Sequence, residues 1–276
     1  MEAIKSLIRF LRYYFRAHTW YRVHSPFVYD FAEAVLEDDR WYYAFSTVET
    51  RREHLLRNRT KLELTDYGAG PRLRRKKKTT VAALARNSAC RPEVGRWLFR
   101  MVNHFKPATV LELGTSLGIS TAYQAAAAPN AKFISIEGDP ASANVAKESL
   151  RLLGISSVEI RQGRFEDELL PALKKLEKLD YLFVDGNHRK TPTLDYFQQC
   201  LPFAHEGSVF VFDDIHWSAE MEEAWAQIKA HPKVSLSIDL FFIGVVFFRK
   251  EKLEKEHFTL IPWSWKPWAV GWGDFF

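Results

Sequence analysis

From residue 108 onward, short apolar segments alternate with segments whose apolar residues recur at helical spacing. The apolar segments begin every 22 to 28 residues and read ATVLELG, KFISIEG, VEIRQG, DYLFVDG and SVFVFDD. The helical segments that follow them cover residues 119–128, 140–153, 166–178, 191–204 and 217–230. Strands that alternate with helices at this spacing form right-handed βαβ units. The pattern predicts an α/β fold with a mostly parallel sheet and helices on both faces.

Two more apolar segments, VSLSIDL and FFIGVVFF, follow the last of these helices with no helical pattern between them. Consecutive strands joined by a short connection pair antiparallel. We therefore expect a C-terminal antiparallel hairpin that closes one edge of the sheet.

The first 105 residues have a different pattern, with helical segments and irregular connections but no alternating strand. Ser25-Pro26 indicates a helix start, because Ser caps helices and Pro fits the first helical position. One expected helix begins at Pro26, and three more cover residues 47–58, 79–88 and 92–105. Turn residues occupy 65–72, and residues 72–78 hold six basic residues in seven, which predicts a solvated loop.

These changes divide the chain into three predicted regions. Residues 1–105 form a helical cap, lid or dimerisation region, residues 106–250 form the α/β domain, and residues 251–276 form a Trp-rich tail. The last sixteen residues contain four tryptophans. A tail this apolar aggregates if it is exposed, so we expect it to dock on its own chain or on a partner. A homodimer is the expected assembly.

The N-terminal segment predicts an amphipathic helix. Its apolar face consists of Ile4, Leu7, Ile8, Leu11 and Phe15. Its basic face consists of Lys5, Arg9, Arg12 and Arg16, and these charges interrupt any apolar run long enough to cross a membrane. Two interpretations stay open. The helix packs on its own domain or a second subunit, which we favour, or it lies on an anionic membrane surface as a peripheral contact.

Composition and charge narrow the function classes. An apolar content of 47% with 21 Phe excludes general disorder, and two cysteines 110 positions apart exclude a disulfide scaffold. Free thiols favour a reducing, cytoplasmic location. The net charge of +5 is the sum of two parts. Residues 1–105 hold 21 basic and 11 acidic residues, whereas residues 106–276 hold 18 and 23. The cap is therefore basic, which favours an anionic partner that meets the cap first.

Candidate chemistry lies where the strands end, because open α/β sheets bind ligands outside the carboxyl ends of their strands. The first strand runs into a Gly-rich turn that contains Gly114 and Gly118, and a helix follows. The second strand ends at Glu137, 23 positions after Gly114, where an acid can accept hydrogen bonds from a ribose diol. Together they predict a nucleoside-bearing cofactor. The turn lacks the glycine spacing of a dinucleotide site.

At this point the sequence resembles a known family. The motifs VLELGTSLGIST, SIEGD, RQGRFED, LDYLFVDGNH and VFVFDDIHW follow in order between about residues 107 and 250. They resemble the motifs of class I S-adenosylmethionine (SAM)-dependent methyltransferases, and among these the O-methyltransferases related to the catechol and caffeoyl-CoA enzymes. The resemblance implies a Rossmann-like sheet of seven strands and SAM as the cofactor. It makes residues 106–250 the SAM-binding methyltransferase domain.

The resemblance also implies the cofactor contacts. Gly114, Thr115 and Ser120 hold the methionine part, Glu137 holds the ribose hydroxyls, and residues 163–165 lie along the adenine. The full set of expected cofactor residues is Glu112, Gly114, Thr115, Ser116, Gly118, Ser120, Glu137, Gly163, Arg164, Phe165 and Asp185.

Three acids end the fourth and fifth strands, namely Asp185, Asp213 and Asp214. Carboxylates that converge at one edge repel unless they are protonated or bind a cation. In the catechol enzymes the matching positions carry Asp, Asp and Asn and bind Mg²⁺, so the resemblance implies a divalent cation here. Asp214 in place of Asn leaves Mn²⁺ and Ca²⁺ open. The alternative is that the aspartates cap helices or bind the cofactor amine.

Two histidines adjoin these acids. His188 stands three residues after Asp185, where the catechol enzymes place the lysine that removes the substrate proton, and an imidazole can accept a proton at neutral pH. His216 is a second candidate for base, ligand or substrate contact. With Asp185 they make up the expected catalytic residues. The expected reaction is in-line methyl transfer from SAM to a hydroxyl of a small, anionic or aromatic acceptor.

Two other functions stay open at this stage. The basic residues 72–78 suggest a nucleic acid acceptor, but the fourth strand is followed by VDGN and not by an amino-methylating N-P-P-Y tetrapeptide. We therefore do not favour nucleic acid. The second alternative is a SAM-binding module without catalysis.

Overall fold

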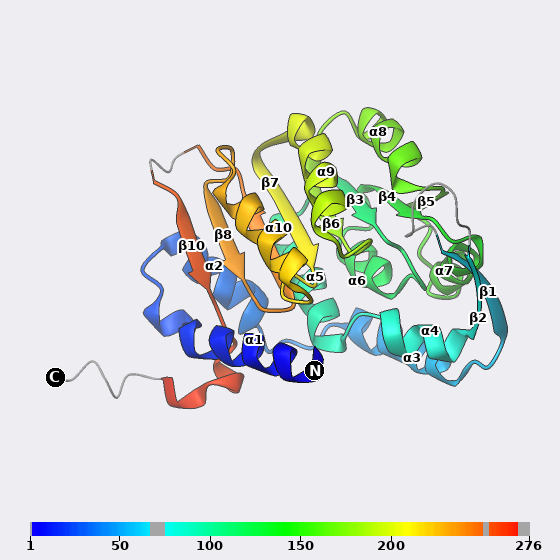
Figure 1. The fold of residues 1–276 in the computed structure, drawn as a ribbon, viewed down its shortest axis with the longest axis horizontal. Helices are drawn as coiled ribbons and strands as arrows, with labels where there is room; N and C mark the ends of the chain where they lie inside the picture. The colour runs from blue at the N-terminus through cyan, green and yellow to red at the C-terminus, as the bar shows by residue number, and fades with distance from the viewer. Residues whose placement is uncertain (1, 67–74, 251–253, 270–276) are drawn as a thin grey trace.

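The fold is built on a sheet of eight strands in the order β10-β8-β9-β7-β6-β3-β4-β5, seen in a computed structural model that describes residues 2–66, 75–250 and 254–269 (Figure 1). The parallel strands are β3 (Thr109–Leu113), β4 (Lys132–Glu137), β5 (Val158–Gln162), β6 (Leu179–Val184) and β7 (Ala204–Asp213). They match the five predicted apolar segments. The predicted α/β class with a mostly parallel sheet is confirmed.

The helices that connect the parallel strands also match the prediction closely. They are α6 (Ile119–Ala127), α7 (Pro140–Leu152), α8 (Phe165–Leu176), α9 (Lys190–Cys200) and α10 (Ala219–Ala230). Successive residues of a strand point to opposite faces, so Val110 enters one core and Leu111 the other. Helices α8, α9 and α10 cover the Leu111 face. This explains why the strands are apolar throughout.

The C-terminal strands extend the sheet differently from the expectation. β8 (Leu236–Asp239) and β9 (Ile243–Phe247) are antiparallel as predicted, but β9 lies between β7 and β8. The edge is closed by β10 (Glu256–Thr259), which runs parallel to β8. The sheet therefore has one strand more than the seven expected. The segment EHFT is short and has a single apolar residue, Phe258, so it has no apolar alternation from which a strand could be predicted.

The region before residue 105 is helical but not only helical. Its helices are α1 (Glu2–Arg16), α2 (Pro26–Phe31) with a π-helical turn (Ala32–Leu36), α3 (Tyr43–Arg57), α4 (Val81–Ser88) and α5 (Pro92–Phe105). A hairpin of β1 (Lys61–Asp66) and β2 (Arg75–Thr80) stands where no strand was expected. Residues 75–78 of the basic run therefore lie in a strand, which corrects the loop prediction, and residues 72–74 lie outside the described residues. The hairpin pairs Glu63 with Lys78 across the strands.

The N-terminal helices share a hydrophobic core with the sheet. Side chains of α2, the π-helical turn and α5 pack on the Val110 face of the sheet. Phe31 of α2 is completely buried, with its ring 6.4 Å from that of Phe105 and 6.1 Å from that of Phe247. The core therefore crosses the domain boundary predicted at residue 105.

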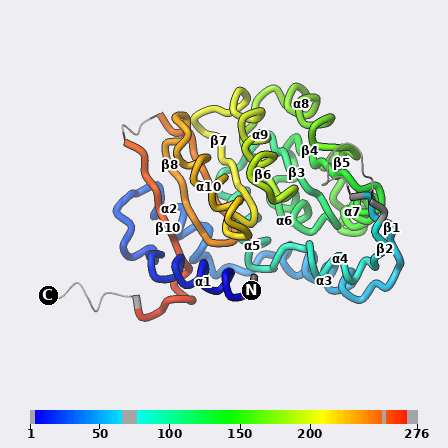
Figure 2. The backbone as a smooth tube through the Cα atoms, viewed as in Figure 1, coloured from blue at the N-terminus to red at the C-terminus, as the bar shows by residue number. Residues whose placement is uncertain are grey.

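Helix α1 lies along the side of the molecule toward which the arrowheads of β7 and β8 point (Figures 1 and 2). The backbone of His18, just after α1, bridges to Leu260 after β10. The helix contacts the protein through Phe10 and Tyr13, which pack on Phe241. The predicted apolar face of α1 is exposed instead. Of the two packings favoured from the sequence, on the helix's own domain or on a second subunit, the exposed face excludes the first and leaves the second as a prediction.

We expect Phe31→Ala to reduce the free energy of unfolding by about 3–5 kcal/mol, because it opens a cavity in a core shared by α2, α5 and β9. Urea unfolding followed by fluorescence and circular dichroism measures this change. Tyr29→Ala is the control, since Tyr29 lies on the same helix and is 39% exposed. A loss below about 1 kcal/mol for Phe31→Ala would show that the N-terminal helices add little to the stability of the sheet.

Candidate active site

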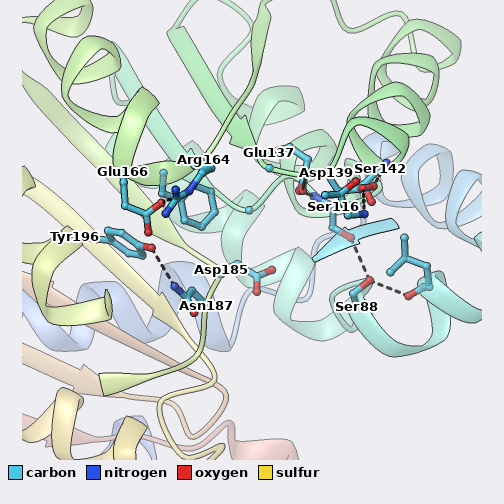
Figure 3. A pocket seen from close by; sticks show the side chains of 16 residues that line it. Ser88, Ser116, Glu137, Asp139, Ser142, Arg164, Glu166, Asp185, Asn187 and Tyr196 are labelled. Carbon is cyan, nitrogen blue, oxygen red and sulfur yellow. Dashed lines mark hydrogen bonds and ion pairs between the residues drawn. The ribbon is translucent and has the colours of Figure 1, made fainter. Parts of the chain in front are cut away.

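Two adjoining cavities lie at the carboxyl ends of the parallel strands. The first has a volume of about 340 Å³ and is bordered by the ends of β3, β4 and β6 (Figure 3). The second has a volume of about 620 Å³ and reaches the end of β7 and the helices α3, α4 and α5. Ser88, Ser116 and Asp185 line both cavities. A ligand in one cavity therefore lies next to a ligand in the other.

The turn after β3 brings the backbone of two strands together. Gly114 has a φ of +101°, and a Cβ atom there would lie 1.9 Å from the carbonyl oxygen of Asp185 at the end of β6. The amide of Asp185 donates to the carbonyl of Leu113 at 2.8 Å. The chain continues from β3 to β4 on one side, while β6 lies on the other side of β3. The first cavity opens at this topological switch point.

Glu137 ends β4 and lines the first cavity. Its carboxylate accepts hydrogen bonds from the amides of Ser116 at 2.7 Å and Asp139 at 2.8 Å. These bonds fix the carboxylate, and each oxygen keeps a lone pair for a ligand hydroxyl. Burial raises the pKa of Glu137 from its ordinary value. Figure 3 shows Glu137, Asp139 and Ser116 grouped at one end of the cavity.

The opposite end of the first cavity is formed by α8, α9 and the turn after β6. Phe165 stacks edge-on against Tyr196, with ring centroids 5.4 Å apart. Asn187 donates to the hydroxyl of Tyr196 at 3.2 Å, and Arg164 pairs with Glu166 at 3.2 Å (Figure 3). This end presents an aromatic edge with polar groups around it, as a purine-binding pocket does.

Several residues that line the first cavity were not predicted from the sequence. They are Thr65, Leu84, Ser88, Gly138, Asp139, Ser142, Glu166, Gly186, Asn187 and Tyr196. Asp139 caps α7 through the amide of Ser142 and also accepts from the amide of Thr65 in β1, each at 2.7 Å. The unexpected hairpin is therefore docked against the cavity. Asp139 before Pro140 is a helix-start signal that could have been used.

Four of the predicted cofactor residues stand behind the cavity wall. Glu112 is completely buried, and its carboxylate accepts from Ser120, Thr121, Gln124 and Ser135 at 2.5–2.9 Å. Thr115 is buried against Ser135, and Gly118 starts α6 with a φ of +80°. None of Glu112, Thr115, Gly118 and Ser120 lines the first cavity, and their contact with the cofactor stays a prediction. They hold the turn and α6 in place.

Of the other predicted cofactor residues, all but one line the first cavity. Gly114, Ser116, Glu137, Arg164, Phe165 and Asp185 line the first cavity. Gly163 does not line it, since it lies against the side chain of Glu168.

The acids at the ends of β6 and β7 gather in the second cavity together with His188. His188 Nε2 lies 3.5 Å from Asp185 Oδ1, and its Nδ1 lies 3.9 Å from Asp214 Oδ2. Burial and the nearby Asp214 raise the pKa of Asp185 to about 6, although His188 opposes this shift. Burial and both neighbouring carboxylates raise the pKa of Asp213 well above its usual range, and the carboxyls of Asp185 and Asp213 share a hydrogen bond. Burial and mutual repulsion therefore disfavour the state in which both side chains are charged.

The acid cluster has the donor atoms of a metal site. Asp185, Asp213 and Asp214 offer only oxygen donors, and their mutual repulsion is the kind that a hard divalent cation relieves. Across the part of the chain that the structure describes, however, no three His, Cys, Asp or Glu side chains stand close enough together to hold a metal ion. The donor chemistry fits Mg²⁺, but the side chains are not gathered into one ligand shell.

His216 lies outside both cavities. Its Nδ1 pairs with Glu222 at 3.0 Å and its Nε2 with Asp239 at 2.9 Å, and the ring stacks on Phe241. Burial lowers the pKa of His216, but the hydrogen bonds to Asp239 and Glu222 outweigh this effect and leave the pKa raised. Both ring nitrogens are occupied by protein carboxylates. These contacts give His216 a structural place in the loop after β7, and its role as base, ligand or substrate contact stays a prediction.

Comparisons with known proteins agree with this geometry. Residues 111–215 match a family model described as a methyltransferase domain. The chain is 34% identical over 128 residues to a catechol O-methyltransferase of Niastella koreensis, covering 45% of this chain and 57% of that protein. It is 29% identical over 161 residues to a catechol O-methyltransferase of Mycobacterium tuberculosis, covering 56% and 69%. The match to a human transmembrane O-methyltransferase is 41% over 86 residues and covers 30% of this chain and 29% of that one. The aligned part thus spans less than two thirds of the first and third of these relatives.

Solved structures share the fold. An O-methyltransferase of Bacillus cereus in complex with SAH aligns with a TM-score of 0.54 and 19% identity, over 76% of this chain and 93% of that one. An SAH-bound methyltransferase of Podospora anserina aligns with a TM-score of 0.56 and 15% identity, over 83% and 98%. The resemblance found in the sequence motifs is confirmed by these comparisons.

We expect the stability of the protein to depend on pH through Glu112. Burial raises its pKa from 4.5 to about 7. The folded chain therefore holds this proton more tightly than the unfolded chain, so the contribution is complete below about pH 4.5 and is lost as pH rises through about 7. Relative to Glu112→Gln, the wild-type protein should lose up to about 3 kcal/mol between pH 4.5 and 8.

Thermal unfolding of both proteins over this pH range measures the effect. Glu93→Gln is the control, because Glu93 is an exposed carboxylate on α5. Melting curves of wild type and Glu112→Gln that shift in parallel with pH would contradict a raised pKa for Glu112.

Proposed function

Since residues 111–215 form a class I SAM-dependent methyltransferase domain of the catechol and caffeoyl-CoA O-methyltransferase type, we propose that this chain transfers a methyl group from SAM to a hydroxyl oxygen of a small molecule. The observation that carries the proposal is the adjacency of the two cavities. The first has an acid at the end of β4 suited to a ribose, and the second has an imidazole among carboxylates. Asp185 borders both.

The cofactor fits the first cavity along its length. Glu137 accepts hydrogen bonds from the ribose hydroxyls, and Phe165 packs against the adenine with Arg164 beside it. The turn of Gly114 and Ser116 receives the methionine part, where its backbone approaches Asp185. The sulfonium of bound SAM would then lie near Asp185, whose carboxylate would attract it. The second cavity, which Asp185 also lines, would receive the acceptor.

The chemistry asked of the protein is positioning and proton removal. The acceptor oxygen attacks the methyl carbon in line with the carbon–sulfur bond, this bond breaks, and S-adenosylhomocysteine (SAH) is left. His188 Nε2 takes the hydroxyl proton, and the carboxylates of Asp185 and Asp214 stabilise the resulting imidazolium. Holding the two reactants in neighbouring cavities lowers the entropic part of the barrier.

A divalent cation, Mg²⁺ or a similar hard ion, is the finer part of the proposal. Asp185, Asp213 and Asp214 would hold it, and their oxygen donors and buried repulsion support this assignment. Such an ion lowers the pKa of a bound hydroxyl and orients it. A homodimer and a cytoplasmic location stay predictions. None of the described helices is both long and apolar enough to cross a membrane.

The test combines SAH binding with methyl transfer from SAM to catechol, followed as SAH by mass spectrometry. We expect transfer with Mg²⁺ and its loss after chelation. Asp213→Asn should keep SAH binding within about twofold but lower transfer about 100-fold or more, because it removes one charge from the acceptor side. Glu137→Ala should weaken SAH binding about tenfold, since it deletes the ribose acceptor.

The control is Asp195→Asn, an exposed acid on α9 that lines neither cavity. Full transfer by Asp213→Asn in the presence of a chelator would refute the metal while leaving the methyltransferase intact. SAH binding without transfer to catechol, phenol or RNA would refute catalysis and favour a SAM-binding module.

A further inference from the structure

Three arginines line the second cavity together with the acids. Arg52 comes from α3, Arg86 from the last turn of α4, and Arg91 directly precedes α5. All three precede the matched methyltransferase domain, which begins at residue 111. Family motifs therefore do not account for them.

The positive charge of Arg91 acts on Asp214, where it opposes the rise in pKa that burial causes. Within the described residues, none of the three arginines makes an ion pair at contact distance with Asp185, Asp213 or Asp214. The Nε atom of Arg52 is buried without a hydrogen-bond partner, which is a costly state for a guanidinium. Arg91 stacks on the ring of Phe242, with its central carbon 4.5 Å from the ring centroid, and stacking leaves the edge N–H groups free to bind.

We propose that the methyl acceptor carries an anionic group, a carboxylate or a phosphate. Arg52, Arg86 and Arg91 bind this group while the acceptor hydroxyl faces His188. The planar fork of a guanidinium matches both anions with two parallel hydrogen bonds. Phe242 and Trp217, which also line the cavity, supply apolar surface for the carbon skeleton between the two ends. The assignment names the substrate class of the proposed methyltransferase and rests on that function.

The test compares an acid with its neutral isostere, 3,4-dihydroxybenzoate and 3,4-dihydroxybenzamide. For Arg52→Gln and Arg86→Gln we expect KM for the acid to rise about tenfold or more, with kcat within about threefold and the amide unaffected. Arg57→Gln is the matched control, because Arg57 lies on the same helix as Arg52 and pairs only with the exposed Glu53 in the described structure. Exposed Arg86 keeps the test valid if Arg52→Gln folds poorly.

Binding of benzoate and of inorganic phosphate to the SAH-loaded protein gives a readout that needs no turnover. Arginine-dependent binding of either anion supports the assignment even if catechol is not methylated, and the tighter of the two names the group. Equal losses for the acid and the amide, with no anion binding, would overturn it, because the arginines would then only balance the aspartates.

A second, independent observation concerns α1. Five large apolar side chains on its outer face are exposed, namely Ile4 63%, Leu7 56%, Ile8 45%, Leu11 42% and Phe15 76%. The helix is held to the protein through other positions, where Phe10, Tyr13 and Tyr14 pack on Phe241 and Trp268. A contiguous exposed apolar stripe on a soluble protein marks a surface that binds something apolar.

The charges beside this stripe indicate what it binds. Lys5, Arg12 and Arg16 are exposed and each follows a residue of the stripe, while Glu2 is the only acid among residues 2–16. Trp268, 67% exposed, lies 6.1 Å from the ring of Tyr14. Apolar residues flanked by lysine and arginine, with a nearby tryptophan, are typical of helices that lie in the headgroup region of a bilayer.

We infer that α1 docks the protein on an anionic lipid surface, with the stripe of Ile4, Leu7, Ile8, Leu11 and Phe15 inserted and the basic residues on the headgroups. A second copy fits this face less well, because α1 offers it basic residues without acids to meet them. Arg9 ties the helix to the second cavity, since it pairs with Glu222 and donates to the carbonyl of Trp217. The mouth of that cavity therefore lies near the bound membrane.

Sedimentation with vesicles tests the inference with the full chain. We expect binding to phosphatidylcholine vesicles that contain 30% phosphatidylglycerol, about tenfold weaker binding to phosphatidylcholine alone, and release by salt. Leu7→Ser with Phe15→Ser should abolish binding and leave the fold intact, because both side chains are exposed. Leu152→Ser, at an exposed leucine on α7, is the control. Absence of vesicle binding, or a dimer in ultracentrifugation that this double variant dissociates, would overturn the inference.

Discussion

The site depends on the close contact between β3 and β6 where Gly114 meets Asp185. Their backbones approach so tightly that a Cβ atom at Gly114 would overlap the carbonyl oxygen of Asp185. The chain leaves β3 toward one side of the sheet while β6 lies on the other, and at this point Gly114 lines the first cavity and Asp185 lines both. The amide of Ser116 is thereby placed on Glu137, and His188 is placed three residues beyond Asp185.

A buried carboxylate supports that contact from behind. Glu112 gathers hydroxyl and amide donors from α6 and from Ser135 of β4, with no cation among these partners. Burying it costs stability, as its raised pKa indicates, but the network fixes the start of α6 relative to β4. The turn between β3 and α6 has to be rigid, since Ser116 adopts a positive φ of 48° there. Both the buried carboxylate and the positive φ lower stability at a place where the cofactor cavity needs a defined shape.

The residues at the ends of the parallel strands could be predicted from the sequence. Buried strands are continuous apolar segments, so the residue that ends each strand can be identified directly. Asp185, Glu137 and Asp213 were predicted for that reason. The positions of Glu112 and His216 and the hairpin of β1 and β2 could not be predicted, for physical reasons. Glu112 points into the protein because successive strand residues point to opposite faces. The sequence does not show that this face is filled by the partners of Glu112 in α6 and not by a ligand. His216 looked catalytic beside Asp214, but Asp239, 23 residues away, takes its Nε2. The hairpin of β1 and β2 has only two apolar residues, Leu62 and Leu64, and its second strand is entirely polar, so no apolar alternation runs through both strands.

The excess positive charge of the first 105 residues acquires a location in the structure. Arg52, Arg86 and Arg91 stand in the wall of the second cavity, and Lys5, Arg12 and Arg16 follow the exposed face of α1. Arg9 joins the two places, because it binds both Glu222 at the start of α10 and the carbonyl of Trp217 at the cavity mouth. Glu222 also holds His216, which in turn holds Asp239 of β8. The loop after β7 is thus held from two sides, by Arg9 of α1 at Trp217 and by Asp239 of β8 at His216.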